Sequence, residues 1–126
     1  MQRSDVETLE KVSGQLQGLH REISLLAKKS NSDGLNVFKL RMLNAALTSA
    51  NVILAQEYKP IDGFEEFDLD DVPSNIDATL VLTAYLEELE RYRADNIVQV
   101  MGDHWKYVLN DGEYIRAAPP KKIKAR

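Results

Sequence analysis

The chain of 126 residues contains no cysteine, which excludes disulfide bonds, thiol chemistry and thiolate metal sites. It also lacks any apolar run close to the ~18 residues that a membrane-spanning helix needs. The first five residues, Met1 to Asp5, have no apolar core of the kind found in signal peptides. These absences predict a cytoplasmic protein that does not enter a membrane.

Motifs for catalysis and cofactor binding are absent as well. The sequence has no HExxH pattern, no Walker A loop and no GxGxxG fingerprint. Its two histidines, His20 and His104, have no Ser or Asp neighbours in a recognisable catalytic signature. A lone histidine on a helix is typically a surface or boundary residue. We therefore expect a protein that is not an enzyme and that holds no cofactor.

One group of acids superficially suggests a calcium loop. Asp68 and Asp70 have the spacing of the first two EF-hand ligands, but Val72 takes the third position and Pro73 the position that needs glycine. The sequence therefore predicts no metal site here. A carboxylate pair that holds magnesium is a minor alternative to the simpler interpretation, in which these acids keep a loop soluble.

What the chain does have is a regular apolar seam near its start. A single narrow stripe forms when residues 5–29 are helical, and Ser4 to Glu7 matches a capping box at its beginning. Such a seam needs another helix, either from this chain or from a second copy, so a homodimer is plausible. The seam consists of Leu9, Val12, Leu16, Leu19, Ile23 and Leu26.

Two glycines, Gly14 and Gly18, lie one turn apart inside this helix, and each costs about 1 kcal/mol relative to alanine. They are either tolerated exposed positions, which is the favoured interpretation, or a place where another backbone approaches closely.

A second helix is predicted between about Asp33 or Asn36 and Pro60. It carries two apolar stripes and a thin polar face of Arg41, Asn44, Thr48 and Asn51. A helix that is apolar on two sides is usually central, with neighbours on both flanks. The first stripe is Leu40, Leu43, Leu47, Ala50 and Leu54, and the second is Phe38, Met42, Ala45, Ser49 and Val52.

A third helix should begin after a cap at Ser74 and end near Asp95. Beyond it, residues 105–109 and 113–116 alternate in the manner of strands around an Asn110-Asp111-Gly112 turn, which predicts a β-hairpin. Residues 97–100 are either a further short strand or the end of the third helix.

The predicted fold is therefore mainly α: a three-helix bundle, made of an antiparallel helical hairpin and a third helix, with a small C-terminal β-hairpin. Residues 1–120 form one domain and residues 121–126 a short basic tail. Eight side chains should share one core: Leu16, Leu19, Ile23, Leu43, Leu47, Leu82, Leu86 and Leu89.

The connection before the third helix is the strongest candidate for a binding surface. Six acids fall between Asp62 and Asp71 with no base among them. In one interpretation the segment docks on a basic protein partner, with its aromatic rings as apolar anchors, and imitates the charge of nucleic acid. In the favoured alternative the rings face inward and the acids are only solvated. The candidate partner-binding residues are Phe64, Glu65, Glu66, Phe67, Asp68, Asp70 and Asp71.

Four bases at the end of the chain form a second candidate surface. The chain has a net charge of -4, but residues 1–120 hold only 12 of the 16 basic side chains and all 20 acidic ones. An acidic body does not attract nucleic acid, so nucleic-acid contact would depend on the tail and would be weak and salt-sensitive. A solvated terminus, or pairing with the acidic body of a second subunit, is an equal alternative. The tail bases are Lys121, Lys122, Lys124 and Arg126.

Together these patterns favour a small, non-enzymatic interaction protein, an adaptor or an inhibitor, that acts through helical surfaces and the acidic segment. The alternative is a nucleic-acid-associated accessory protein that uses the basic tail.

Overall fold

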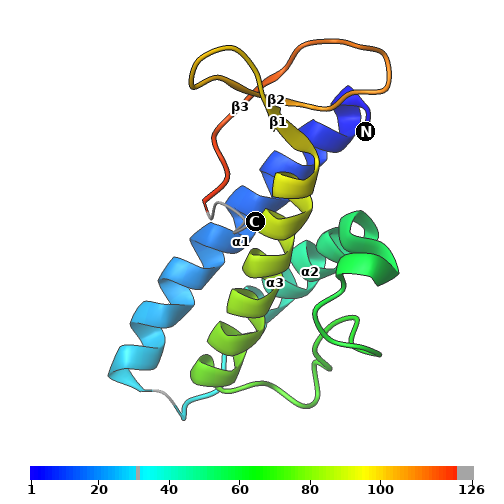
Figure 1. Cartoon of the computed structure of the whole chain (residues 1–126). Coiled ribbons are helices and arrows are strands. Elements are labelled where there is room, and N and C mark those ends of the chain that lie inside the picture. Colours follow the sequence, from blue (N-terminus) through cyan, green and yellow to red (C-terminus); the bar gives the residue numbers. More distant parts are fainter. Residues whose placement is uncertain (31, 122–126) are drawn as a thin grey trace.

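The protein consists of three packed helices with a small sheet at one end. The computed structural model describes residues 1–30 and 32–121. Helix α1 (Arg3–Lys29) runs antiparallel to α3 (Asn75–Asp95), and α2 (Val37–Tyr58) packs against both helices (Figure 1). Strands β1 (Ile97–Gln99), β2 (Trp105–Tyr107) and β3 (Arg116–Ala117) follow α3. The predicted mainly α fold, a three-helix bundle with a C-terminal β element, is confirmed.

Helix α1 begins slightly earlier than expected. The Asp5 carboxylate accepts a hydrogen bond from the Gln2 backbone N–H at 2.7 Å, and Gln2 is the N-cap residue. The predicted capping box of Ser4 and Glu7 is therefore wrong, because Ser4 already lies within the first turn. As predicted, an acid in the first turn accepts a hydrogen bond from a free backbone N–H, and its negative charge interacts favourably with the positive end of the helix dipole.

Most of the apolar seam of α1 is buried inside the chain. Leu9, Val12, Leu16 and Ile23 are buried in the same core as the inner residues of α2 and α3, so most of this seam is closed within the chain, whereas Leu19 and Leu26 are only partly buried and line a groove between α1 and α2. Six of the eight predicted core residues belong to this core, and the other two, Leu19 and Leu86, are partly buried and pack against it. A seam that looked narrow enough for a coiled-coil dimer is instead shared between two helices of the same chain.

Helix α2 differs from the prediction because only one of its two apolar stripes is covered. The first stripe, from Leu40 to Leu54, is buried throughout. The second, which we call the outer stripe, is exposed: 73 % for Phe38, 48 % for Met42 and 79 % for Val52. The central position predicted for this helix is therefore wrong in the single chain. Both neighbouring helices contact the inner side of α2, and the α2–α3 connection binds Asn44 and Asn51 of its polar face.

The last turn of α2 is set off by a backbone break at Ala55, which has φ 51° and ψ -157°. The break separates the short final turn from the body of the helix. Within this turn Tyr58 is buried, contacts Tyr92 edge-on and donates a hydrogen bond to Asp95 at 2.7 Å. That bond to a carboxylate, helped by burial, raises the pKa of Tyr58 to about 12.

We expect Ala55→Gly to stabilise the protein. Backbone angles of this kind are nearly restricted to glycine and cost other residues about 1–3 kcal/mol. Glycine also makes the unfolded chain more flexible, which lowers the free energy of unfolding by about 0.4–1 kcal/mol. The net increase in the free energy of unfolding, measured with urea, should therefore be about 1 kcal/mol. Ala45→Gly is the matched control, because Ala45 lies in regular helix and should lose about 1 kcal/mol. Equal losses for both variants would mean that α2 is continuous through Ala55.

The sheet confirms the predicted β element but changes its details. Residues 97–99 are a strand rather than an extension of α3, and the strand order is β1-β2-β3, all antiparallel. In the hairpin Trp105 pairs with Ala117 and Lys106 with Arg116, so a loop of residues 108–115 replaces the predicted tight turn. Gly112, at φ 74°, lies in this loop. Short strands at both edges leave little backbone free to pair with another chain.

Candidate functional site

The acidic segment, residues 62–71, lies against the polar face of α2, and two asparagines hold it there. Asn44, which is buried, donates to the carbonyl of Phe67 at 2.8 Å and accepts from the Phe67 N–H at 2.9 Å. A side-chain amide that bonds both ways in this manner replaces the pairing that a neighbouring strand would supply. The backbone of the segment is thereby fixed at its midpoint.

A second contact lies two turns further along α2. The amide of Asn51 donates to the carbonyl of Glu65 at 2.9 Å and accepts from the hydroxyl of Tyr85 at 2.7 Å. Tyr85 is fully buried, and this burial raises the pKa of its hydroxyl despite the bond to Asn51. The acidic segment, α2 and α3 therefore meet in one hydrogen-bonded group.

The aromatic side chains of the segment face the core. Phe64 and Phe67 are partly buried and contact each other edge-on, with ring centroids 5.1 Å apart. Phe64 also lies 6.3 Å from the ring of Tyr85. This is the geometry of the favoured interpretation, in which both rings pack against the core.

The carboxylates of the same segment point into solvent. The five candidate acids are all exposed, and Glu65 pairs with Lys59 at the start of the connection. The Asp68 side chain also accepts a hydrogen bond from the Asp70 N–H at 2.9 Å, which tightens the turn. The structure thus brings the predicted acids together on a fixed backbone: Glu65, Glu66, Asp68, Asp70 and Asp71.

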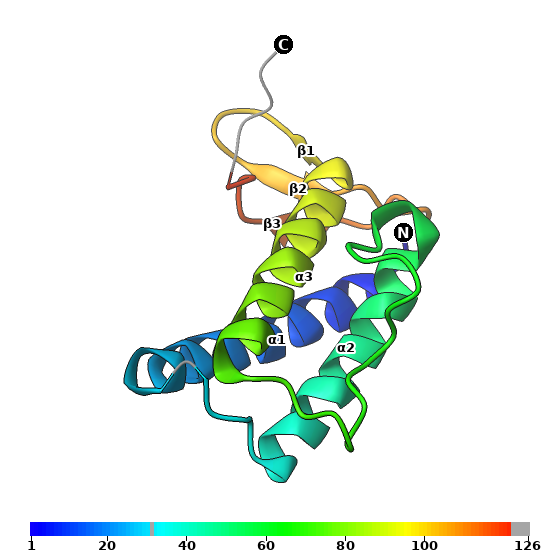
Figure 2. The same ribbon diagram turned by 90° about the horizontal axis from the view of Figure 1, so that it is seen from below.

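An open groove of about 1240 Å³ lies between α1 and α2. The sequence did not single it out as a site. Figure 2 shows the two helices from below, where they diverge toward the connection that joins them. Gly14 and Gly18 line the groove on α1, and Met42, Ala45 and Ser49, all of the outer stripe, line it on α2. The groove is therefore continuous with the exposed apolar stripe.

The two glycines of α1 lie beneath open space. A Cβ atom built on Gly14 or Gly18 meets nothing within 4 Å among the described residues. No described part of the chain uses the close approach that these glycines permit. Their 4-residue spacing beside an exposed apolar stripe was the sequence signal for the groove.

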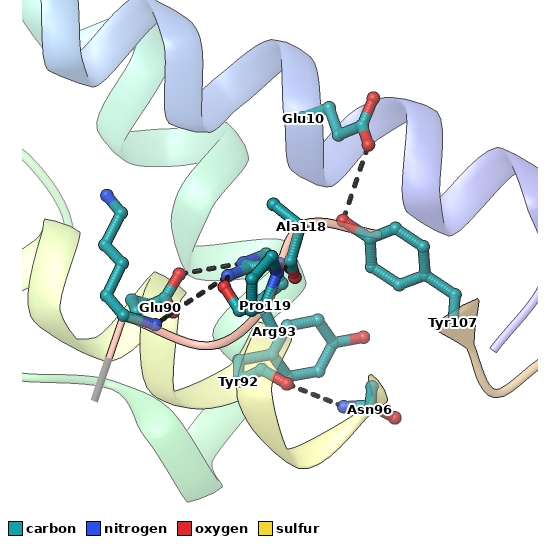
Figure 3. Close-up of polar contacts among 9 residues, drawn as sticks. Glu10, Glu90, Tyr92, Arg93, Asn96, Tyr107, Ala118 and Pro119 are labelled. Carbon is teal, nitrogen blue, oxygen red and sulfur yellow. Dashed lines mark hydrogen bonds and ion pairs between the residues drawn. The ribbon is translucent and has the colours of Figure 1, made fainter. Parts of the chain in front are cut away.

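The C-terminal segment is fastened to α3 by a charged cluster (Figure 3). Arg93 binds both carboxylate oxygens of Glu90, at 2.8 and 3.0 Å, and donates to the carbonyls of Ala118 and Pro119. The Lys121 N–H donates to Glu90 at 2.9 Å. Burial alone would raise the pKa of Glu90, but the hydrogen bonds from Arg93 and Lys121 outweigh it and lower the pKa. The other predicted tail bases, Lys122, Lys124 and Arg126, lie outside the described residues.

Among the described residues, the two histidines do not lie in a cluster of catalytic side chains. The Nε2 atom of His20 lies 3.0 Å from the hydroxyl of Thr83, and His104 is exposed near the β1–β2 turn. Across residues 1–30 and 32–121 no group of three or more His, Asp or Glu side chains could hold a metal ion. Among the same residues, no helix has the length and apolar character that a membrane span requires.

Comparisons with known proteins add no family to these observations. No family model, no curated protein and no solved structure matches this chain. The groove, the outer stripe and the acidic segment are the features of the described residues that bear on function.

Proposed function

We propose that this protein is a non-enzymatic interaction module that binds a helical segment of a partner protein in the groove between α1 and α2. The observation that carries this proposal is the exposed outer stripe of α2 beside that groove. Its residues repeat at spacings of 4, 3, 4 and 3, which is the pattern of a helix that contacts another helix along a seam.

The exposure of this stripe is concentrated rather than scattered. Phe38, Met42 and Val52 lie on one face of α2, and Leu25 of α1, which lines the groove, is 56 % exposed. Isolated exposed apolar residues are common on soluble proteins, but a contiguous patch beside a groove is typical of an interaction site. Helices dock into such grooves through residues at i, i+3, i+4 and i+7.

The glycine at position 18 allows a test that does not threaten the fold. Gly18→Leu places a side chain in the open groove and should improve helix stability by up to about 1 kcal/mol. Gly18→Ala is the matched control, because it brings a similar helix gain but adds only one methyl group. Both variants should therefore melt above the wild type.

The functional measurement is affinity capture from the native cell with wild type, Gly18→Leu and Gly18→Ala. We expect at least one protein that wild type and Gly18→Ala retain and Gly18→Leu loses. An identical set of retained proteins for all three forms would remove the groove as the binding site.

A second candidate surface is the acidic segment, because Asn44 and Asn51 hold its backbone rigidly while its carboxylates remain exposed. Preorganised carboxylates would accelerate association with a basic partner at low salt. The groove and the acidic segment lie on different sides of α2, so the two together would make an adaptor. Changing the five acids to Asn or Gln in the same capture experiment should remove a basic partner and leave the groove partner bound.

The alternative role in nucleic-acid binding depends on the basic tail. Of its four bases only Lys121 is described, and its N–H is bound to Glu90. No observation on the described residues favours this role over protein binding.

A further inference from the structure

We infer that the occupant of the groove is an amphipathic helix whose apolar stripe is flanked by acidic residues. This inference rests on the proposed function, and it specifies the chemistry of the partner from the shape and the charge of the groove.

The size of the groove suits a short helical segment. Its lining residues run along α1 from Glu7 to Lys29, a length of about 33 Å at 1.5 Å per residue, which is long enough for a helix of three turns. Its small lining residues, among them Gly14, Gly18 and Ala45, allow a partner backbone to come near the floor.

The charge of the groove is opposite to that of the rest of the molecule. Three bases and two acids line it, whereas the whole chain has 16 bases and 20 acids. One of the two acids, Glu22, already pairs with Lys39 of α2 at 3.4 Å. The remaining charges are those of Lys11, Arg21, Lys29 and Glu7, which favour a partner with carboxylates beside its apolar stripe.

The same charges disfavour a second copy that docks through its own outer stripe. Apart from Lys39, which is paired with Glu22, helix α2 carries Arg41 and has no acid before Glu57. Its insertion into the groove of another copy would bring Arg41, and no compensating acid, near Lys11, Arg21 and Lys29. Like charges at an interface suppress the wrong partner.

Two synthetic helical peptides test the inference by fluorescence anisotropy. Both carry the same leucine stripe at 3-4 spacing; one has glutamates at the flanking positions and the other has lysines. We expect the glutamate peptide to bind about tenfold more tightly at low salt, with the difference shrinking as salt screens the charges. Gly18→Leu should abolish this binding, and Gly18→Ala should preserve it.

A charge variant distinguishes the contribution of the charged lining residues from that of the apolar lining of the groove. Arg21→Gln with Lys29→Gln should remove the preference for glutamate while weak binding of both peptides remains. Lys28→Gln is the control, since Lys28 is exposed on α1 but does not line the groove, and it should leave the preference intact.

Three outcomes would overturn the inference: equal binding of both peptides, tighter binding of the lysine peptide, or a preference for glutamate that survives in Gly18→Leu. A wild-type dimer that Gly18→Leu makes monomeric in sedimentation would identify a second copy as the occupant instead. If no peptide binds but Gly18→Leu still loses a cellular partner, the inference falls and the groove function stands. If both experiments fail, the proposed function falls as well.

Discussion

Replacing Leu47 by alanine should lower the free energy of unfolding by about 2–5 kcal/mol. Leu47 lies on the inner side of α2, has no exposed surface, and belongs to the core that α1 and α3 share with it. The substitution removes buried methyl and methylene groups and leaves a cavity that the surrounding side chains only partly close. Because the total stability of a domain is about 5–15 kcal/mol, one such change consumes a large share of it.

The control for this prediction is the same substitution at an exposed position. Leu80 of α3 is 62 % exposed, so Leu80→Ala should change stability by about 0.5 kcal/mol or less. Leu19→Ala should fall between the two, because Leu19 is only partly buried. Urea unfolding of the three variants gives the order directly. A Leu47→Ala loss as small as that of Leu80→Ala would mean that α2 does not pack through this stripe.

Replacing Asn44 by alanine should cost about 2–4 kcal/mol and release the acidic segment. The change leaves the N–H and the carbonyl of Phe67 without their partner at once, and each costs about 1–3 kcal/mol when it is buried and unsatisfied. Because the segment is held at this point, its opening should free Phe64 and Phe67 from the core as well. Faster hydrogen exchange at the Phe67 amide would report the opening.

Thr48→Ala is the matched control for Asn44→Ala. Thr48 lies one turn along the same polar face and is exposed, so its loss should change stability by about 0.5 kcal/mol or less. It should also leave exchange at Phe67 unchanged. Unaltered exchange in Asn44→Ala would show that the aromatic rings, rather than the asparagine, hold the segment in place.

Much of the fold follows from local patterns in the sequence. The periodic burial of α1, α2 and α3 matches the spacing of their aliphatic residues, since a helix exposes the same face every three to four residues. The caps also depend only on neighbours along the chain: Ser74 accepts from the Asp77 N–H at 3.2 Å, as predicted. The start of α1 was missed because Ser4 is the more usual N-cap residue, whereas the helix begins after Gln2 and uses Asp5 as the acid of its capping box.

The candidate site was harder to predict, because it depends on which surfaces remain uncovered. Asn44 and Asn51 appeared only as a thin polar face, although two asparagines seven residues apart on an apolar helix were a signal for backbone contacts. The glycine pair was identified, but the open space above it depends on how α2 diverges from α1 (Figure 2). No pattern along one helix reports that angle.

Residue types and their short-range spacing were enough to predict the three helices, the apolar stripes along them, the β element and the acidic character of the connection. Three features depend instead on long-range packing: which apolar stripe of α2 is covered, how much of the α1 seam is closed within the chain, and the inward orientation of Phe64 and Phe67. These features are long-range because the apolar faces of the helices compete for a limited buried interface. Apolar faces gain similar free energy per unit area wherever they are buried, so the choice among them depends on how all three helices and their connections fit together.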